Sequence, residues 1–130
     1  MDRVFLDANV LFSAAYKTET RLLRLWKVKN IVLCSSRYAL EEARVNLETE
    51  EQRDRLLKLS QALEIFDVVT GSLRIRTVLP EKDQPILTAA IEARATHLLT
   101  GDIRHFGSFF GRKVEGVKIL LPGDYLRSLV

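Results

Sequence analysis

The chain has 130 residues, of which 47% are hydrophobic and 28% are charged, and this composition excludes a disordered protein. A chain of this length buries roughly two-thirds of its extended surface on folding, so we expect one domain over residues 1–130. Its 20 Lys and Arg residues exceed its 17 Asp and Glu residues and give a net charge of +3, which permits a polyanionic partner without demonstrating one.

Short β-branched runs alternate with longer helical stretches, a pattern that is typical of an α/β domain with a parallel sheet. The first strand is expected at residues 4–6 and ends at Asp7. In chain order, the elements predicted after it are helices at 9–15 and 20–29, a strand at 31–34, helices at 37–50 and 51–63, a strand at 65–69, a helix at 85–95, strands at 97–100 and 117–121, and a short helix that opens at 122–123.

Local signals mark the boundaries of these elements. Ser35 and Ser36 offer N-cap hydroxyls to the helix at 37–50, and Pro85 suits the first turn of the next predicted helix. Residues 101–102 carry a Gly-Asp turn signal, as residues 70–72 carry a Thr-Gly-Ser signal. Residues 73–78 alternate apolar and basic side chains, which leaves an edge strand and an extended loop both open.

Three features favour a cytosolic protein without a membrane partner. No apolar run is long enough to span a bilayer. Asp2 and Arg3 lead directly into the first strand and no small-residue cleavage site follows, so we expect no secretory signal. Cys34 is the single cysteine, which excludes an internal disulfide framework and a cysteine-based zinc site. We expect this cysteine to pack as a small core residue.

Three acids are predicted at one edge of the sheet. Asp7 ends the first strand, and Asp102 follows the strand at 97–100 through a one-residue turn. In an open parallel sheet, ligands bind beyond the carboxyl ends of the strands. Asp83 precedes the helix at 85–95 and so lies at its N-terminal end, where a negative charge is best tolerated. We therefore expect these three carboxylates near the same edge.

A fourth acid is expected on the helix at 37–50. At ~100° per residue, its charged stripe contains Arg37, Glu41, Arg44 and Glu48. Its core stripe contains Leu40, Ala43 and Leu47. Glu42 and Asn46 fall between the stripes, beside apolar neighbours, and a carboxylate buried there needs a partner. Of the adjacent pair, Glu42 is therefore the functional candidate, with Asn46 supporting it, and Glu41 is the solvated acid.

Each acid alone also has a structural explanation, as a helix cap, a turn residue or a surface charge. Together they point to a cation site, because two carboxylates ~5 Å apart repel by about 3 kcal/mol at an effective dielectric near 20. Mg²⁺ or Mn²⁺ suits a site of few carboxylates, and such ions can activate water for phosphodiester cleavage. His97 and His105 are expected to stand alone, and no Cys/His set supports zinc.

Four segments resemble the motifs of PIN-domain ribonucleases, in particular the small single-domain proteins grouped with VapC-type toxins. The segments are VFLDANVLFSA at 4–14, YALEEARVNL at 38–47, KDQPILTAAIEARATHLLTGD at 82–102 and IRHF at 103–106. The resemblance extends from Val4 to about Leu121 in the expected order and spacing. It implies a three-layer α/β/α sandwich with a central, mainly parallel sheet.

The resemblance implies that Asp7, Glu42, Asp83 and Asp102 are the catalytic metal ligands, with Glu42 a ligand or a water-orienting base. Asn9 matches a polar residue that steadies the first acid, and Thr100 matches a hydroxyl before the last acid. Ala8 departs from the family, because many members carry Thr or Ser there. The implied activity is a cytoplasmic, Mg²⁺- or Mn²⁺-dependent endoribonuclease that uses metal-activated water. The implied partners are RNA, a protein antitoxin and a second copy in a homodimer.

Basic residues are expected to carry the RNA contacts. Arg74 and Arg76 alternate with apolar residues, so they can follow a phosphate backbone from one face. Arg104, two residues after Asp102, is placed to touch a scissile phosphate. The alternative for each is a solvated surface charge.

Two other functions remain open from the sequence. A haloacid-dehalogenase-type phosphatase uses a second Asp two residues after its nucleophile, but this chain has Asn9 at that position. Phe106 also stands where a downstream acid would fall. The other alternative is a catalytically silent RNA- or protein-binding module, which metal-dependent stabilisation would separate from an enzyme.

Overall fold

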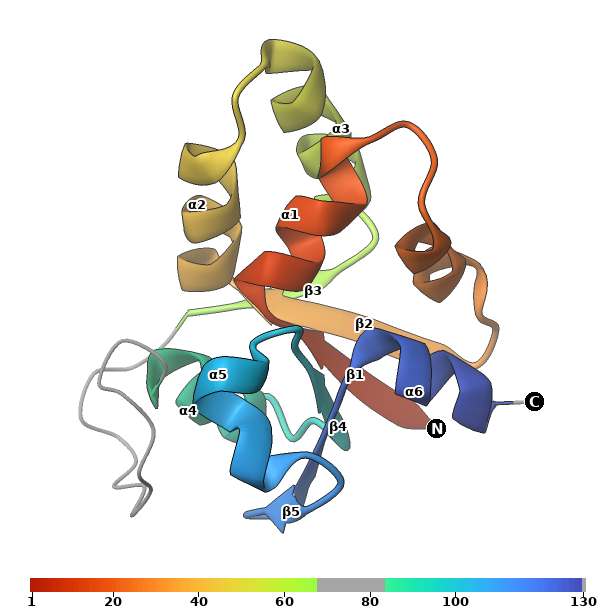
Figure 1. The fold of residues 1–130 in the computed structure, drawn as a ribbon, viewed down its shortest axis with the longest axis vertical. Helices are drawn as coiled ribbons and strands as arrows, with labels where there is room; N and C mark the ends of the chain where they lie inside the picture. Colours follow the sequence, from red (N-terminus) through yellow and green to blue (C-terminus); the bar gives the residue numbers. More distant parts are fainter. Residues whose placement is uncertain (68–83, 130) are drawn as a thin grey trace.

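The computed structural model describes residues 1–67 and 84–129. Six strands of this part form one sheet in the order β3-β2-β1-β4-β6-β5 (Figure 1). Their bounds are Asp2–Leu6 for β1, Ile31–Ser36 for β2, Glu64–Phe66 for β3, His97–Leu99 for β4, Lys113–Val114 for β5 and Val117–Leu120 for β6. All neighbouring strands are parallel except β5 and β6, which are antiparallel.

Helices flank this sheet. Their bounds are Ala8–Tyr16 for α1, Arg37–Asn46 for α2, Glu50–Ser60 for α3, Gln84–Glu92 for α4, Ile103–Phe106 for α5 and Pro122–Ser128 for α6. Two 3₁₀-helices, Arg21–Lys27 and Gly107–Phe109, complete the described elements. Figure 1 shows α1 beside α2 and α3, and α1 contacts both. The expected α/β class with a mainly parallel sheet is confirmed.

β1 is the strand that positions the candidate site. It pairs with β2 on one side and β4 on the other, and its residues Val4, Phe5 and Leu6 are fully buried. This is the apolar run expected of a parallel strand that is covered on both faces. The Asp7 N–H donates to the Leu99 carbonyl at 3.0 Å, so the end of β1 lies against the end of β4.

The predicted long helices end earlier than expected. The helix predicted at 37–50 is α2 and ends at Asn46, and the helix predicted at 51–63 is α3, Glu50–Ser60. Thr49 and Gln52 form a capping box, which makes α3 a separate helix with its own N-terminus. Ser36 caps α2 as expected, whereas Ser35 donates its hydroxyl to the Leu6 carbonyl at 2.7 Å and links β2 to β1 instead.

Other expectations need correction in the C-terminal half and near residue 20. The predicted helix at 20–29 is a shorter 3₁₀-helix. Neither α5 nor the hairpin of β5 and β6 was predicted from the sequence. Glu115 and Gly116 connect these two strands with positive φ angles of 51° and 85°, the backbone pattern of a two-residue hairpin turn. The Glu-Gly pair at 115–116 was the sequence signal that could have indicated this turn.

Several expectations fall on residues that the structure does not describe. They are residues 68–69 of the strand predicted at 65–69, of which β3 ends at Phe66, the turn at 70–72, the alternating segment at 73–78 with Arg74 and Arg76, and Asp83. Cys34 is fully buried, and this burial raises its thiol pKa to about 12, which confirms its place in the core. Of the described helices, none has the length and apolar character that crossing a bilayer requires.

Candidate metal and catalytic site

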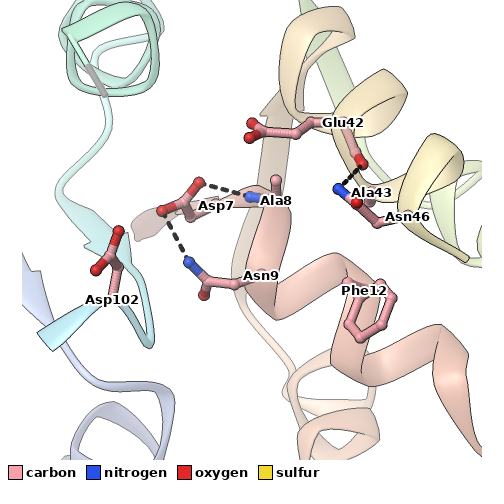
Figure 2. Close-up of a pocket in the computed structure, with 8 residues that line it drawn as sticks. All are labelled: Asp7, Ala8, Asn9, Phe12, Glu42, Ala43, Asn46 and Asp102. Atoms are coloured by element: carbon pink, nitrogen blue, oxygen red, sulfur yellow. Dashed lines mark hydrogen bonds between the residues drawn. The ribbon is translucent and has the colours of Figure 1, made fainter. Parts of the chain in front are cut away.

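A hollow of about 430 Å³ lies at the carboxyl ends of β1 and β4, and residues of α1 and α2 line it (Figure 2). Its lining residues are Asp7, Ala8, Asn9, Phe12, Glu42, Ala43, Asn46 and Asp102. Three predicted acids therefore share one hollow although they come from three separate segments. Figure 2 shows the carboxylates of Asp7 and Asp102 turned toward each other, with Glu42 extending from α2 above them.

Asp7 is held in place by several donors. The residue is 5% exposed, and its Oδ1 accepts a hydrogen bond from the Ala8 N–H at 2.6 Å. Its Oδ2 accepts from the Asn9 amide at 3.1 Å and from the Thr100 hydroxyl at 2.8 Å. Asp7 thus caps α1 and also lines the hollow. These three donors are neutral, so they orient the carboxylate without cancelling its charge.

Asn9 connects the two strand ends. Its amide nitrogen contacts both Asp7 and the Thr100 hydroxyl oxygen, the latter at 3.2 Å. Its Oδ1 accepts from the Gly101 N–H at 2.7 Å. A Cβ at Gly101 would lie 3.4 Å from this oxygen, which is at the limit of ordinary van der Waals contact. Asn9 therefore holds the turn before Asp102 next to Asp7.

Asp102 contacts a residue that the sequence analysis set aside. Its Oδ1 accepts from the His105 N–H at 3.1 Å, and its Oδ2 lies 2.7 Å from His105 Nδ1. The expectation that His105 stands alone is therefore wrong. The sequence did contain a signal for this contact. His105 is the third residue after Asp102 of the Gly-Asp turn, and a side chain at that position can reach back to the residue that caps a helix.

Glu42 lies in the hollow for a different reason than the predicted one. It is exposed, and its neighbours Tyr38 and Val45 are also exposed, at 40% and 58%. The expectation of an acid buried among apolar residues is therefore wrong. Asn46 donates to the backbone carbonyl of Glu42 at 2.8 Å, so this hydrogen bond supports the helix and not the carboxylate.

Glu41 faces away from the hollow, as expected of the solvated acid. It forms an ion pair with Arg44, with 2.5 Å between Oε1 and Nη2. The hydrogen bond from Arg44 lowers the pKa of Glu41 below its usual value. Two adjacent acids of α2 thus differ in direction, and only Glu42 lines the hollow.

The residues present fit a hard divalent cation in donor type. The hollow offers carboxylate and amide oxygens, and Mg²⁺ typically takes one or two protein carboxylates and keeps several waters. Within residues 1–67 and 84–129, no three His, Cys, Asp or Glu side chains are close enough together to hold an ion jointly. The fourth predicted ligand, Asp83, lies outside the described residues, immediately before α4.

The predicted phosphate contacts are placed only in part. Arg104 is exposed on α5, two residues after Asp102. Arg74 and Arg76 lie outside the described residues.

Comparison with known proteins identifies the family. Residues 3–104 match the model of the PIN domain family. The fold is similar to a chain in the crystal structure of VapBC2 from Rickettsia felis bound to a DNA fragment from their promoter. The two share 20% sequence identity and a TM-score of 0.68, and the match covers 90% of this chain and 96% of that one. No curated protein sequence matches this chain. Because the family match spans most of its length, the chain belongs to the PIN domain family.

Proposed function

We propose that the chain is an endoribonuclease that cleaves RNA phosphodiesters with Mg²⁺ or Mn²⁺. One observation carries the proposal: Asp7, Glu42 and Asp102 come from three separate segments and line one hollow at the carboxyl edge of the sheet. Carboxylates that line one hollow repel one another, and a cation bound between them would offset that repulsion. Membership of the PIN family supports the same activity.

Each acid has a proposed role. Asp7, Asp83 and Asp102 would hold the cation, and Glu42 would be a further ligand or would orient the attacking water. A bound divalent cation would supply a more acidic water and charge neutralisation at the phosphate. Asn9 and Thr100 hold the Asp7 carboxylate by the hydrogen bonds described above.

The remaining residues in the proposal serve RNA binding. Arg104 is exposed beside Asp102 and would contact the phosphate at the cleavage point. Arg74 and Arg76 would extend the path of the RNA backbone. The net charge of +3 favours approach of a polyanion, so RNA affinity should fall as the salt concentration rises.

The proposal includes partners and a compartment. We propose a role as the toxin of a cytoplasmic toxin–antitoxin pair, with a protein antitoxin and a homodimer as assemblies. The similarity to a chain of the VapBC2 structure supports this role. A small neighbouring gene for a DNA-binding protein would support it further.

The two alternatives make different predictions. A phosphatase of the haloacid-dehalogenase type needs an acid two residues after Asp7, but Asn9 there donates an amide hydrogen to Asp7. A silent binding module would bind RNA or protein without cleaving RNA, and Mg²⁺ or Mn²⁺ would not stabilise it. Metal-dependent stabilisation and cleavage together separate the enzyme from the silent module.

The decisive test uses Asp7→Asn, which removes one charge while keeping the size of the side chain. Wild-type protein should cleave single-stranded RNA in the presence of Mn²⁺, and EDTA should abolish this cleavage. The variant should lose cleavage while its circular dichroism spectrum stays unchanged. Full activity in the variant, or wild-type cleavage that persists in EDTA, would contradict the proposal.

A further inference from the structure

The one-turn helix α5 places an imidazole directly against the Asp102 carboxylate. His105 is the third residue after Asp102, so the first turn of α5 brings its backbone and its ring back to the same side chain. The backbone N–H of His105 donates to Oδ1, and the ring nitrogen Nδ1 lies 2.7 Å from Oδ2. Both oxygens of Asp102 are therefore contacted by one residue.

The chemistry of the pair fixes which atom donates. A carboxylate only accepts hydrogen bonds, so Nδ1 of His105 carries the hydrogen in this contact. The side chain of Asp102 is 24% exposed and that of His105 is 21% exposed, so water competes with the contact only in part. A carboxylate has about four lone-pair positions, and His105 occupies two of them. The other two remain for a ligand in the hollow.

Helix capping alone does not account for the ring contact. The bond from the backbone N–H of His105 to Oδ1 already caps α5. Phe106, the next residue, is fully buried and anchors the turn in the core. The second bond, from the ring to Oδ2, instead restricts rotation of the carboxylate group. It determines which way the lone pairs of Asp102 point.

We propose that His105 is a positioning residue that sets the orientation of the Asp102 carboxylate for cation binding. The inference rests on the proposed metal-dependent function. Partners that hydrogen-bond a ligating carboxylate typically change metal affinity by 10- to 100-fold when they are removed. Asp7 is oriented in the same manner by Asn9 and Thr100. Both acids at the ends of β1 and β4 are therefore held by side-chain donors from the segments that follow these strands.

His97 provides a matched control within the same chain. Its side chain is 19% exposed, close to the 21% of His105. Its ring also makes one short contact, 2.8 Å from Nδ1 to the Thr96 hydroxyl oxygen, and packs edge-on against Tyr125. It lies at the start of β4, whereas the hollow lies beyond the end of that strand. Its loss should therefore affect folding without affecting the hollow.

The experiment measures Mn²⁺ affinity by isothermal titration calorimetry, without RNA, in four proteins. These are the wild type, His105→Phe, His105→Asn and His97→Phe. His105→Phe keeps a ring without a donor, so its dissociation constant should rise about 10- to 100-fold. His105→Asn keeps a donor near the position of Nδ1, so its affinity should stay close to that of the wild type. His97→Phe should bind Mn²⁺ as the wild type does.

Thermal unfolding in EDTA measures the stability of each variant separately, and titrations run where all four proteins are folded. Wild-type affinity in His105→Phe would overturn the inference and leave the proposed function standing. Equal weakening in His105→Asn, or in His97→Phe, would also overturn it, because the effect would then not depend on the donor. A wild-type chain that binds no Mn²⁺ would overturn both the inference and the proposed function.

Discussion

The two ends of β1 carry acids in contrasting surroundings. At the start of the strand, Asp2 accepts a hydrogen bond from the Tyr125 hydroxyl at 2.8 Å and lies 3.9 Å from the imidazole of His97. Beside it, Arg3 forms an ion pair of 3.2 Å with Glu64. At the end of the strand, Asp7 accepts from a backbone N–H, an amide and a hydroxyl, and shares a hollow with two further acids.

The contrast separates stability from function along one strand. At the amino end, Glu64 pairs with Arg3 and Asp2 accepts from the Tyr125 hydroxyl, so both acids are tied to neighbouring elements of the fold. At the carboxyl end, acids gather around Asp7, and the donors described there orient it without neutralising it. The amino end is therefore expected to contribute to folding, and the carboxyl end to the proposed cation site.

The largest effect is expected from the adjacent acids of α2. Glu42→Gln should lower RNA cleavage by roughly 100-fold or more, the range for loss of a group that assists proton transfer. Glu41→Gln alters a neighbouring acid that faces outward and pairs with Arg44, so it should leave cleavage unchanged. Initial rates at saturating Mn²⁺ would compare the two variants. Equal loss in both would mean that the direction of the side chain does not matter.

A smaller effect is expected at the amino end. Tyr125→Phe removes the hydrogen bond to Asp2 from a fully buried ring, so it should lower the free energy of unfolding by about 1–3 kcal/mol. Urea denaturation would measure this loss. Cleavage per folded molecule should stay at the wild-type level, and a fall in cleavage at unchanged stability would break the separation of the two ends.

The smallest effect concerns pH. Burial lowers the pKa of His97 below its usual value of 6.5, so the unfolded chain binds a proton that the folded chain binds less readily. The free energy of unfolding should therefore fall as the pH drops below about 6.5. Urea midpoints of wild type and His97→Phe at about pH 7.5 and pH 5.5 would test this. His97→Phe should lose less stability between these values than the wild type.

Much of the sheet edge could be predicted because its signals are local. The buried run before Asp7 and the strand before Asp102 each end in an acid, and parallel strands bring such ends together. The angular positions of residues on the predicted helix also identified Glu42, and not Glu41, as the candidate for the site. The supposed reason was wrong, however, since Glu42 is exposed. Its direction follows from the packing of α2 against α1, which single-helix periodicity does not contain.

The features that were missed depend on chain reversals or on side-chain capping. The separate start of α3 depends on the capping box of Thr49 and Gln52. The contact of His105 with Asp102 depends on a helix of one turn, which is too short to show periodicity. The hairpin at residues 113–120 depends on two residues with positive φ, of which only one is glycine.

The central claim, that acids at the carboxyl edge hold a divalent cation, is tested most directly by Mn²⁺-dependent stabilisation. Thermal or urea unfolding would be followed with and without Mn²⁺ in the wild type, Asp7→Asn and Asp2→Asn. Mn²⁺ at about 100 times its dissociation constant should stabilise the wild type and Asp2→Asn by roughly 2.7 kcal/mol, and Asp7→Asn much less. Equal stabilisation of Asp7→Asn, or none in the wild type, would contradict the claim.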